Sequence, residues 1–276
     1  MLRMVILAGL IALGLAASSA GASEVLQPSG PWKIDYAPNE CRLLRTFGTG
    51  DAAVTLRFAR GAGLDSFDML IAGKGLPQIR QAHIPVKLRL APGGIEQVFD
   101  GYSMALPDRP EQFIRWFDGD PKILDSVSDG QSLEFVVGRK YSLTINLAKG
   151  GAALKGLNYC HAELLKSWGL DPAGLAAQVV RPKLRGVPTN WFTSGAYPTK
   201  ALHEEKQGTV LVVLSIATTG KITDCRIAVS SKVAELDEKT CRIFRTRASY
   251  TPAKGADRQP IKGTDVQRVR WLIPKE

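Results

Sequence analysis

A stretch of 24 residues from Gly208 to Ser231 reads GTVLVVLSIATTGKITDCRIAVSS. Apolar residues recur at every second position in each half of it, at Val210, Val212, Leu214 and Ile216 and then at Cys225, Ile227 and Val229. A period of two with one apolar face is typical of a β-strand. Thr219-Gly220 lies between the two halves and has the residue types of a tight turn. The stretch therefore predicts a β-hairpin.

Further elements are predicted on both sides of this hairpin. Pro198 favours a helix start before a short helix at 200–207, which Gly208 ends. After the hairpin, apolar residues between Val233 and Phe244 recur at three and four, which predicts an amphipathic helix. A last strand at 266–273 places Val269, Trp271 and Ile273 on one face and Arg268 and Arg270 on the other. The order for residues 191–276 is α-β-β-α-β.

The sequence from 23 to 170 has a different pattern. Short alternating runs such as Val54–Phe58, Val86–Leu90 and Tyr141–Leu147 are separated by Gly, Pro, Ser and Asp. Six or more such runs predict an antiparallel β-rich domain, a sandwich or a barrel. The period then changes to three and four between Leu154 and Trp168, which predicts one helix that closes this domain. We therefore expect an α+β chain with two domains.

A linker is predicted between the domains at 171–190. It contains Pro172, Pro182 and Pro188 and few large apolar side chains. The whole chain has 276 residues and a formal net charge of +10, with 45% hydrophobic and 22% charged residues. This composition excludes disordered, collagen-like and multi-span membrane proteins. The residues from 196 onward carry 15 basic and 9 acidic side chains, so the C-terminal domain is the part attracted to acidic partners, such as an anionic envelope surface.

Residues 1–22 have the pattern of a secretory signal peptide. Arg3 precedes an apolar run from Met4 to Ala17, and Ala20-Gly21-Ala22 supplies small residues for cleavage after Ala22. The alternative is an uncleaved inner-membrane anchor, because the run approaches the length of about 20 residues that a spanning helix needs. The sequence thus predicts an exported, periplasmic protein, and an exported address argues against a nucleic-acid partner.

The predicted export of the protein bears on the state of its four cysteines. An even number of cysteines in an oxidising compartment indicates disulfides, and four allow three pairings. Pairing within domains is the simplest choice, and it joins Cys41 to Cys160 and Cys225 to Cys241. Free buried thiols are the alternative.

The sequence has few candidates for catalysis or metal binding. His203-Glu204-Glu205 lacks the second histidine of a zinc-protease helix, and Cys160 and His161 would point in different directions on a helix. We expect no cofactor, no metal and no enzyme activity, although an enzyme in the first domain is kept as a third hypothesis.

The C-terminal third resembles the C-terminal domain of TonB-type energy transducers, over roughly residues 190–275. The resemblance rests on an ordered set of short motifs: Ala196-Tyr197-Pro198, Gln207-Gly208-Thr209-Val210, Thr219-Gly220-Lys221, Val229-Ser230-Ser231, Leu236-Asp237, Tyr250-Thr251-Pro252-Ala253 and Arg268-Val269-Arg270-Trp271. Related domains also have a cysteine in the second strand and in the second helix, which Cys225 and Cys241 match. The family pattern usually has Gly after the paired serines, where this chain has Lys232.

The resemblance implies a periplasmic domain that grips an extended segment, the TonB box, of an outer-membrane receptor. An exposed last strand would offer its backbone to the incoming segment, a mode called β-augmentation. The implied partner-binding residues are Val266, Gln267, Arg268, Val269, Arg270, Trp271 and Leu272. Arg268 and Arg270 would also steer the domain toward acidic receptor plugs.

The resemblance does not extend to the N-terminal part. TonB proteins begin with an uncleaved anchor that couples to an inner-membrane motor, followed by a Pro-rich spacer, and neither is expected here. Contact with the motor is therefore doubtful, whereas binding of a receptor or another envelope protein remains. The alternative is a structural envelope protein that docks peptidoglycan, lipopolysaccharide or protein and has no transport role.

Overall fold

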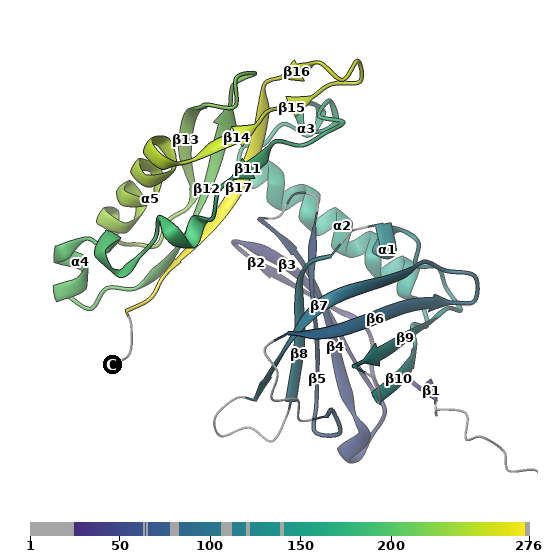
Figure 1. The fold of residues 1–276 in the computed structure, drawn as a ribbon. Helices are drawn as coiled ribbons and strands as arrows, with labels where there is room; N and C mark the ends of the chain where they lie inside the picture. The colour runs from purple at the N-terminus through teal and green to yellow at the C-terminus, as the bar shows by residue number, and fades with distance from the viewer. Residues whose placement is uncertain are drawn as a thin grey trace, which may run out of the picture.

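The computed structural model describes residues 25–62, 64, 66–77, 83–105, 112–119, 122–138 and 141–273. The predicted signal peptide, residues 1–22, lies outside the described residues. Among the helices that the structure describes, none has the length and apolar character required to span a membrane. The chain is β-rich with a few helices, and a large curled sheet lies below a smaller α/β part (Figure 1).

The large sheet has ten strands in the order β1-β10-β9-β6-β7-β8-β5-β4-β3-β2. Their bounds are β1 Val25–Leu26, β2 Lys33–Ala37, β3 Glu40–Phe47, β4 Val54–Gly61, β5 Phe67–Gly73, β6 Ile84–Ala91, β7 Glu96–Ala105, β8 Gln112–Gly119, β9 Ser132–Val137 and β10 Tyr141–Asn146. All neighbours are antiparallel except β1 and β10. We call this part the barrel domain.

The first strand brings the two ends of the curled sheet together. Leu26 pairs with Ile145 of β10, and two residues later Pro28 forms a bridge to Phe47 of β3. The N–H of Gly48 donates to the carbonyl of Gln27 over 2.8 Å. Inward residues of β3, β4, β5, β6, β8, β9 and β10 then join one buried cluster, as the alternating apolar pattern requires, and partly buried residues of β1, β2 and β7 pack against it.

Helix α2, Gly150–Ser167, packs against β2, β3 and β4. Its buried residues are Gly150, Leu154, Leu157, Cys160, His161 and Leu164. A disulfide joins Cys160 to Cys41 of β3, and the Trp168 Nε1–H at the end of the helix donates to the carbonyl of Pro38. The short helix α1, Lys122–Asp125, precedes β9.

The segment predicted as a linker has structure of its own. It contains α3, Pro172–Ala176, which Asp171 caps, and β11, Lys183–Arg185, which pairs with β14. Val180 also forms a bridge to Lys254. Backbone pairing thus holds this segment on the small part, an interaction that a count of its apolar side chains does not reveal.

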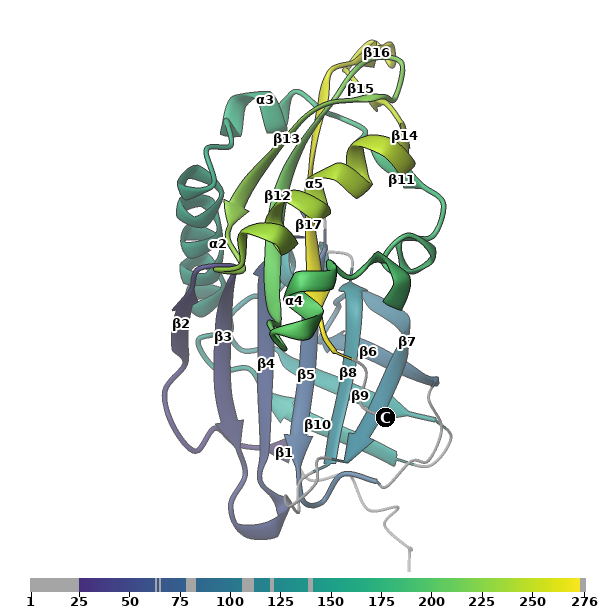
Figure 2. The same ribbon diagram turned by 90° about the vertical axis from the view of Figure 1, so that its left-hand side faces the viewer.

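The remaining elements form the small domain. They are the 3-10 helices Pro188–Asn190 and Ser194–Ala196, α4 Thr199–His203, β12 Gly208–Ile216, β13 Ile222–Val229, α5 Ala234–Arg247, β14 Ser249–Thr251, β15 Ala253–Lys254, β16 Pro260–Ile261 and β17 Gly263–Trp271. Strands β13, β12 and β17 form one antiparallel sheet in that order. Helix α5 packs on one face of it (Figure 2).

Two turns show why particular residues occur in the small domain. Gly220 has a φ of 83°, and a Cβ there would lie 2.0 Å from the carbonyl oxygen of Tyr250, so only glycine fits. Lys232 has a φ of 69°. Lys232 follows the paired serines, at the position where the family pattern usually has glycine. The backbone there is left-handed, a conformation that favours glycine, although the residue is a lysine.

The two domains share buried residues. Leu211, Val213 and Val266 point to the sheet face opposite α5 and belong to the same buried cluster as Trp168 and Leu170. Arg226 of β13 also donates a hydrogen bond through Nη2 to the carbonyl of Trp168. The barrel domain therefore covers one face of the small sheet.

Candidate functional site

The predicted partner-binding residues lie on and just beyond β17, at one edge of the small sheet. Its residues from Gly263 to Trp271 pair in register with β12, from Ile216 back to Gly208. Among the described residues, no strand pairs with the other side of β17. This free side is called the β17 edge below.

Backbone groups of alternate residues point to the β17 edge. In an antiparallel strand the N–H and C=O of one residue face the same side, and the next residue faces the other side. The N–H of Thr264 donates to Gln178 Oε1 over 3.1 Å, and the N–H of Val266 donates to Asp265 Oδ1 over 2.8 Å. Both bonds lie away from β12, so Arg268 and Arg270 also present their backbone groups outward.

The β17 edge is thus closed at its start and open at its end. The chain's own side chains satisfy the N–H groups of Thr264 and Val266. From Arg268 onward, no backbone hydrogen bond to a further strand exists within the part of the chain that the structure describes. Arg268 and Arg270 are exposed, and Leu272 is 51% exposed. In Figure 1 this end of β17 leads away from the barrel domain.

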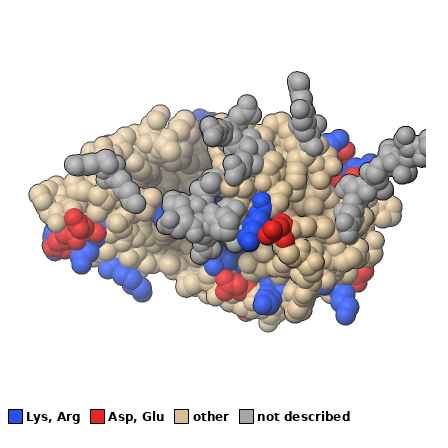
Figure 3. Space-filling view, turned by 90° about the horizontal axis from the view of Figure 1, so that it is seen from below, with Lys and Arg blue, Asp and Glu red and all other residues tan. Residues whose placement is uncertain are grey.

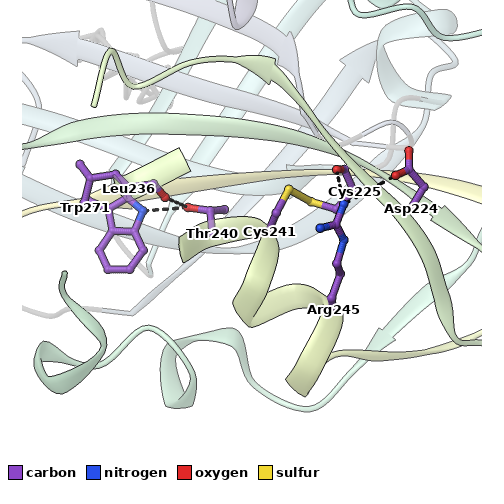
Figure 4. The surroundings of a disulfide bond; sticks show 7 residues. All are labelled: Asp224, Cys225, Leu236, Thr240, Cys241, Arg245 and Trp271. Atoms are coloured by element: carbon purple, nitrogen blue, oxygen red, sulfur yellow. Dashed lines mark hydrogen bonds and ion pairs between the residues drawn. A yellow bond between two sulfur atoms is a disulfide. The ribbon is translucent and has the colours of Figure 1, made fainter. Parts of the chain in front are cut away.

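The opposite edge of the sheet, at β13, is less suited to strand addition. Its pairing with β12 has two register shifts, which bend a strand locally. Cys225 directs its carbonyl outward by the same alternation, and Arg245 Nη2 donates to that oxygen over 3.0 Å. Arg245 also lies 3.7 Å from Asp224 (Figure 4). The β17 edge is therefore the better candidate.

One face of β17 belongs to the core beneath α5. Val269 and Trp271 are buried, as the alternation predicted. Trp271 Nε1 donates to Thr240 Oγ1 over 2.9 Å, and that hydroxyl donates to the carbonyl of Leu236 over 2.7 Å (Figure 4). The Trp271 ring also packs edge-on against Phe192 and Tyr197.

Asp265 and Tyr250 hold the start of the strand. Tyr250 Oη donates to Asp265 Oδ2 over 2.8 Å, and Gln267 Nε2 donates to the same oxygen over 2.7 Å. Burial, together with the Asp265 carboxylate, raises the pKa of Tyr250 well above its ordinary value. This network keeps Asp265 in place to cap the N–H of Val266.

The other face of β17 meets the barrel domain. Val266 is buried there, and Arg268 places Nη1 3.6 Å from Glu40 and Nη2 4.0 Å from Asp68. These carboxylates also bind Arg42 and Arg115 over 2.6 and 2.9 Å. Sequence reasoning placed Arg268 and Arg270 together on an outward face. In the structure the Arg268 charge is directed at the barrel domain.

Charge on the visible surface is mixed. From below, Lys and Arg side chains lie next to Asp and Glu side chains in small groups (Figure 3). On this face, the described residues form no single basic surface.

Both disulfides occur in the pairing chosen from the sequence. Cys225 of β13 and Cys241 of α5 are bonded across the edge of the core (Figure 4), and Cys41 is bonded to Cys160. Cys41 and Cys160 are 1% and 2% exposed, so this bond lies in the core of the barrel domain.

Two kinds of residue were not predicted from the sequence. Gln178 accepts a hydrogen bond at the start of the β17 edge, and Leu211 and Val213 lie on the sheet face that the barrel domain covers. Gln178 comes from the predicted linker, and no local pattern marks its role. Leu211 and Val213 did carry a signal, because Val210–Leu214 is apolar at every position and not only at alternate ones. A strand that is apolar on both faces is typically buried on both.

The other polar residues considered for catalysis or metal binding do not form a site with one another. His161 is buried, and burial, with a smaller effect of nearby Arg60, lowers its pKa to about 4. His83 Nδ1 lies 2.7 Å from Asp100 at the surface. Within the described residues, no group of three or more His, Cys, Asp or Glu side chains is placed to hold a metal ion.

The comparison with protein families agrees with the geometry of the small domain. The family model of the Gram-negative bacterial TonB protein C-terminal matches residues 194–272, under a third of the chain. No curated protein and no solved structure matches the chain. Residues 194–272, which include β12, β13, α5 and β17, therefore form a domain of the TonB C-terminal family.

Proposed function

We propose that this protein is a periplasmic, non-enzymatic envelope protein that binds an extended segment of an outer-membrane receptor by adding it as a strand to the β17 edge. The observation that carries the proposal is the open backbone of Arg268 and Arg270. Binding at this edge supports energy-coupled transport across the outer membrane, the role that the family suggests.

The open part of the edge favours a short partner segment. It runs from Arg268 to Leu272, so the N–H and C=O groups of three alternate residues, Arg268, Arg270 and Leu272, are the available partners. Each backbone hydrogen bond contributes about 1 kcal/mol net. A segment of about five residues is the natural length for this stretch, because Gln178 and Asp265 already accept from the N–H groups of Thr264 and Val266 before it.

Backbone recognition can be separated from charge at Arg270. Arg270→Pro removes one outward N–H while the bonds to β12, which the neighbouring residues make, are kept. Arg270→Ala removes only the side chain. Arg268 is less suitable for this test because its ion pairs with Glu40 and Asp68 couple it to the barrel domain.

The experiment measures binding of fluorescently labelled receptor segments that contain a TonB box to the full exported chain, by anisotropy. We expect Arg270→Pro to weaken binding at least fivefold, the equivalent of one backbone hydrogen bond of about 1 kcal/mol, while circular dichroism and thermal unfolding stay unchanged. Arg270→Ala should cost threefold or less, and less still at high salt. Equal losses in both variants would instead indicate a charge-dependent surface site.

The second candidate is a structural envelope protein without a transport role. It is favoured by the buried cluster that the two domains share, since a fixed pair of domains suits a scaffold. Deletion of the gene separates the two: growth on nutrients that enter through such receptors is impaired only under the first proposal. Mass spectrometry of the native N-terminus tests the predicted cleavage after Ala22 and, with it, the periplasmic location.

A further inference from the structure

A groove on the barrel domain lies outside the site described above. Its volume is about 570 Å³, within the usual range of ligand sites. Its lining is mostly apolar and comes from the first residues of the sheet, from β3 and from the start of α2. The lining residues are Pro28, Gly30, Pro31, Trp32, Arg45, Ala148, Lys149, Ala152 and Ala153.

Two cations line this groove, and none of its described lining residues is acidic. Within the part of the chain that the structure describes, neither Arg45 nor Lys149 forms an ion pair. The nearby Asp129 accepts from the N–H of Gly151, and it is not among the lining residues. Burial lowers the pKa of the Arg45 guanidinium, the direction expected of a cation without an anion beside it.

The carbonyl of Ala148 fixes the polar part of the groove. It accepts from Trp32 Nε1 over 3.2 Å and also from Arg45 Nη1. Arg45 Nε donates to the carbonyl of Gly30 over 2.7 Å, and the guanidinium lies 5.3 Å from the centroid of the Trp32 ring. Arg45 Nη2 has no protein acceptor among the described residues. The guanidinium is thus held in one orientation with donors to spare.

The second cation of the groove, Lys149, has an unusual backbone conformation. It has a φ of 59°, in the left-handed region that is costly for a lysine, and it lies at the start of α2. Its side chain is on the exposed rim of the groove.

We propose that this groove binds an anionic lipid of the cell envelope. The phosphate of the lipid would accept hydrogen bonds from Arg45 Nη2 and Lys149 Nζ, and its hydrocarbon part would lie on Pro28, Pro31 and Trp32. Guanidinium and ammonium groups bind phosphate strongly when no carboxylate competes. A mostly apolar lining beside two cations fits a molecule with an apolar body and an anionic end, whereas a free inorganic anion would leave the apolar part of the lining uncovered.

The test uses isothermal titration of the full exported chain with dodecyl phosphate, uncharged dodecyl maltoside and inorganic phosphate, and both dodecyl compounds are kept below micelle-forming concentrations. We expect dodecyl phosphate to bind at least tenfold more tightly than dodecyl maltoside, because only the phosphate can accept charge-assisted hydrogen bonds from Arg45 and Lys149, and one such bond contributes about that factor. We expect inorganic phosphate to bind at least tenfold more weakly than dodecyl phosphate.

The variants separate the groove from general surface charge. Lys149→Asn removes the cation, and asparagine tolerates the left-handed backbone at this position. This variant should therefore weaken dodecyl phosphate binding about fivefold. Arg45→Gln should weaken it further, and its thermal unfolding is recorded because Arg45 also has structural bonds. Lys221→Gln, at an exposed turn of the small domain, is the control and should leave binding unchanged.

Three results would overturn the proposal. Equal binding of the two dodecyl compounds would indicate an unspecific apolar surface. Equal binding of inorganic phosphate would indicate a small-anion site. Unchanged binding in folded Lys149→Asn would place the ligand elsewhere. None of these outcomes depends on whether receptor segments bind at β17.

Discussion

The two disulfides close loops of very different length, and this sets their expected contributions to stability. The cysteines of the Cys41–Cys160 bond are 119 residues apart and those of the Cys225–Cys241 bond are 16 apart. Loop-closure entropy then gives a nominal stabilisation of about 4.9 kcal/mol for the first bond and about 3.1 kcal/mol for the second. Replacing both cysteines of a pair by alanine should lower the free energy of unfolding by up to these amounts.

The longer loop also has a structural reason to cost more. Cys160 lies on α2 and Cys41 on β3, so their bond ties the last main element of the barrel domain to one of its first strands. The end of α2 in turn carries the carbonyl that Arg226 of the small domain bonds. Loss of Cys41–Cys160 should therefore loosen the contact between the domains, whereas loss of Cys225–Cys241 should stay within the small domain.

Urea unfolding of the oxidised chain, followed by circular dichroism and tryptophan fluorescence, measures both effects. Peptide mapping without reduction first verifies the two bonds in the wild-type protein, and reduced wild type is the control for each alanine pair. A larger loss of stability on removing Cys225–Cys241 than on removing Cys41–Cys160 would contradict the dependence on loop length, and this dependence is the basis of the prediction. The prediction is also contradicted if either alanine pair matches oxidised wild type within about 1 kcal/mol, because the cross-link would then not restrict the unfolded chain as assumed.

Four further predictions concern single positions or segments. Burial lowers the pKa of His161 to about 4, so between pH 6.5 and 4 the unfolded chain binds more protons than the folded chain. The free energy of unfolding therefore falls as the pH falls through this window. In urea titrations across the window, His161→Gln should remove up to about 3 kcal/mol of that loss. Thr240→Val leaves Trp271 Nε1 without its acceptor and should cost about 1–3 kcal/mol in urea unfolding, whereas Thr240→Ser should cost less. Lys232→Gly should raise the melting temperature through a gain of up to about 1 kcal/mol, and an unchanged or lower value would show that the left-handed lysine is not strained. Limited proteolysis should cut first at 186–190, after β11, and primary cuts inside the barrel strands would contradict the proposed domain boundaries.

The sequence allowed prediction of features that depend on local periodicity. The alternation in Val210–Ile216 and the three-and-four spacing between Val233 and Phe244 result from burial of one face of a single element. The disulfide pairing also followed, because the two halves of the chain differ in pattern and each contains two cysteines.

Features that depend on packing between distant elements were not predictable in this way. The closing of the large sheet through Leu26 and Pro28 depends on a register between strands more than 100 residues apart in the chain. The contact of Arg268 with Glu40 and Asp68 depends on which sheet face the barrel domain covers. Pairing of the predicted linker with β14 depends on backbone groups, which composition does not describe.

The position of β17 between two packed surfaces bears on how a partner is recognised. Val269 and Trp271 are committed to the core beneath α5, and Val266 and Arg268 are committed to the barrel domain. Little side-chain surface of the strand is then left to read a partner's sequence, and the free part of β17 is its edge from Arg268 onward. Recognition through that edge depends on backbone hydrogen bonds, which any extended segment can form. If receptor segments bind at this edge as proposed, selectivity among them should therefore come from side chains that flank the edge, such as Arg270 and Leu272. Substitutions there should change which segments bind more than whether a segment binds.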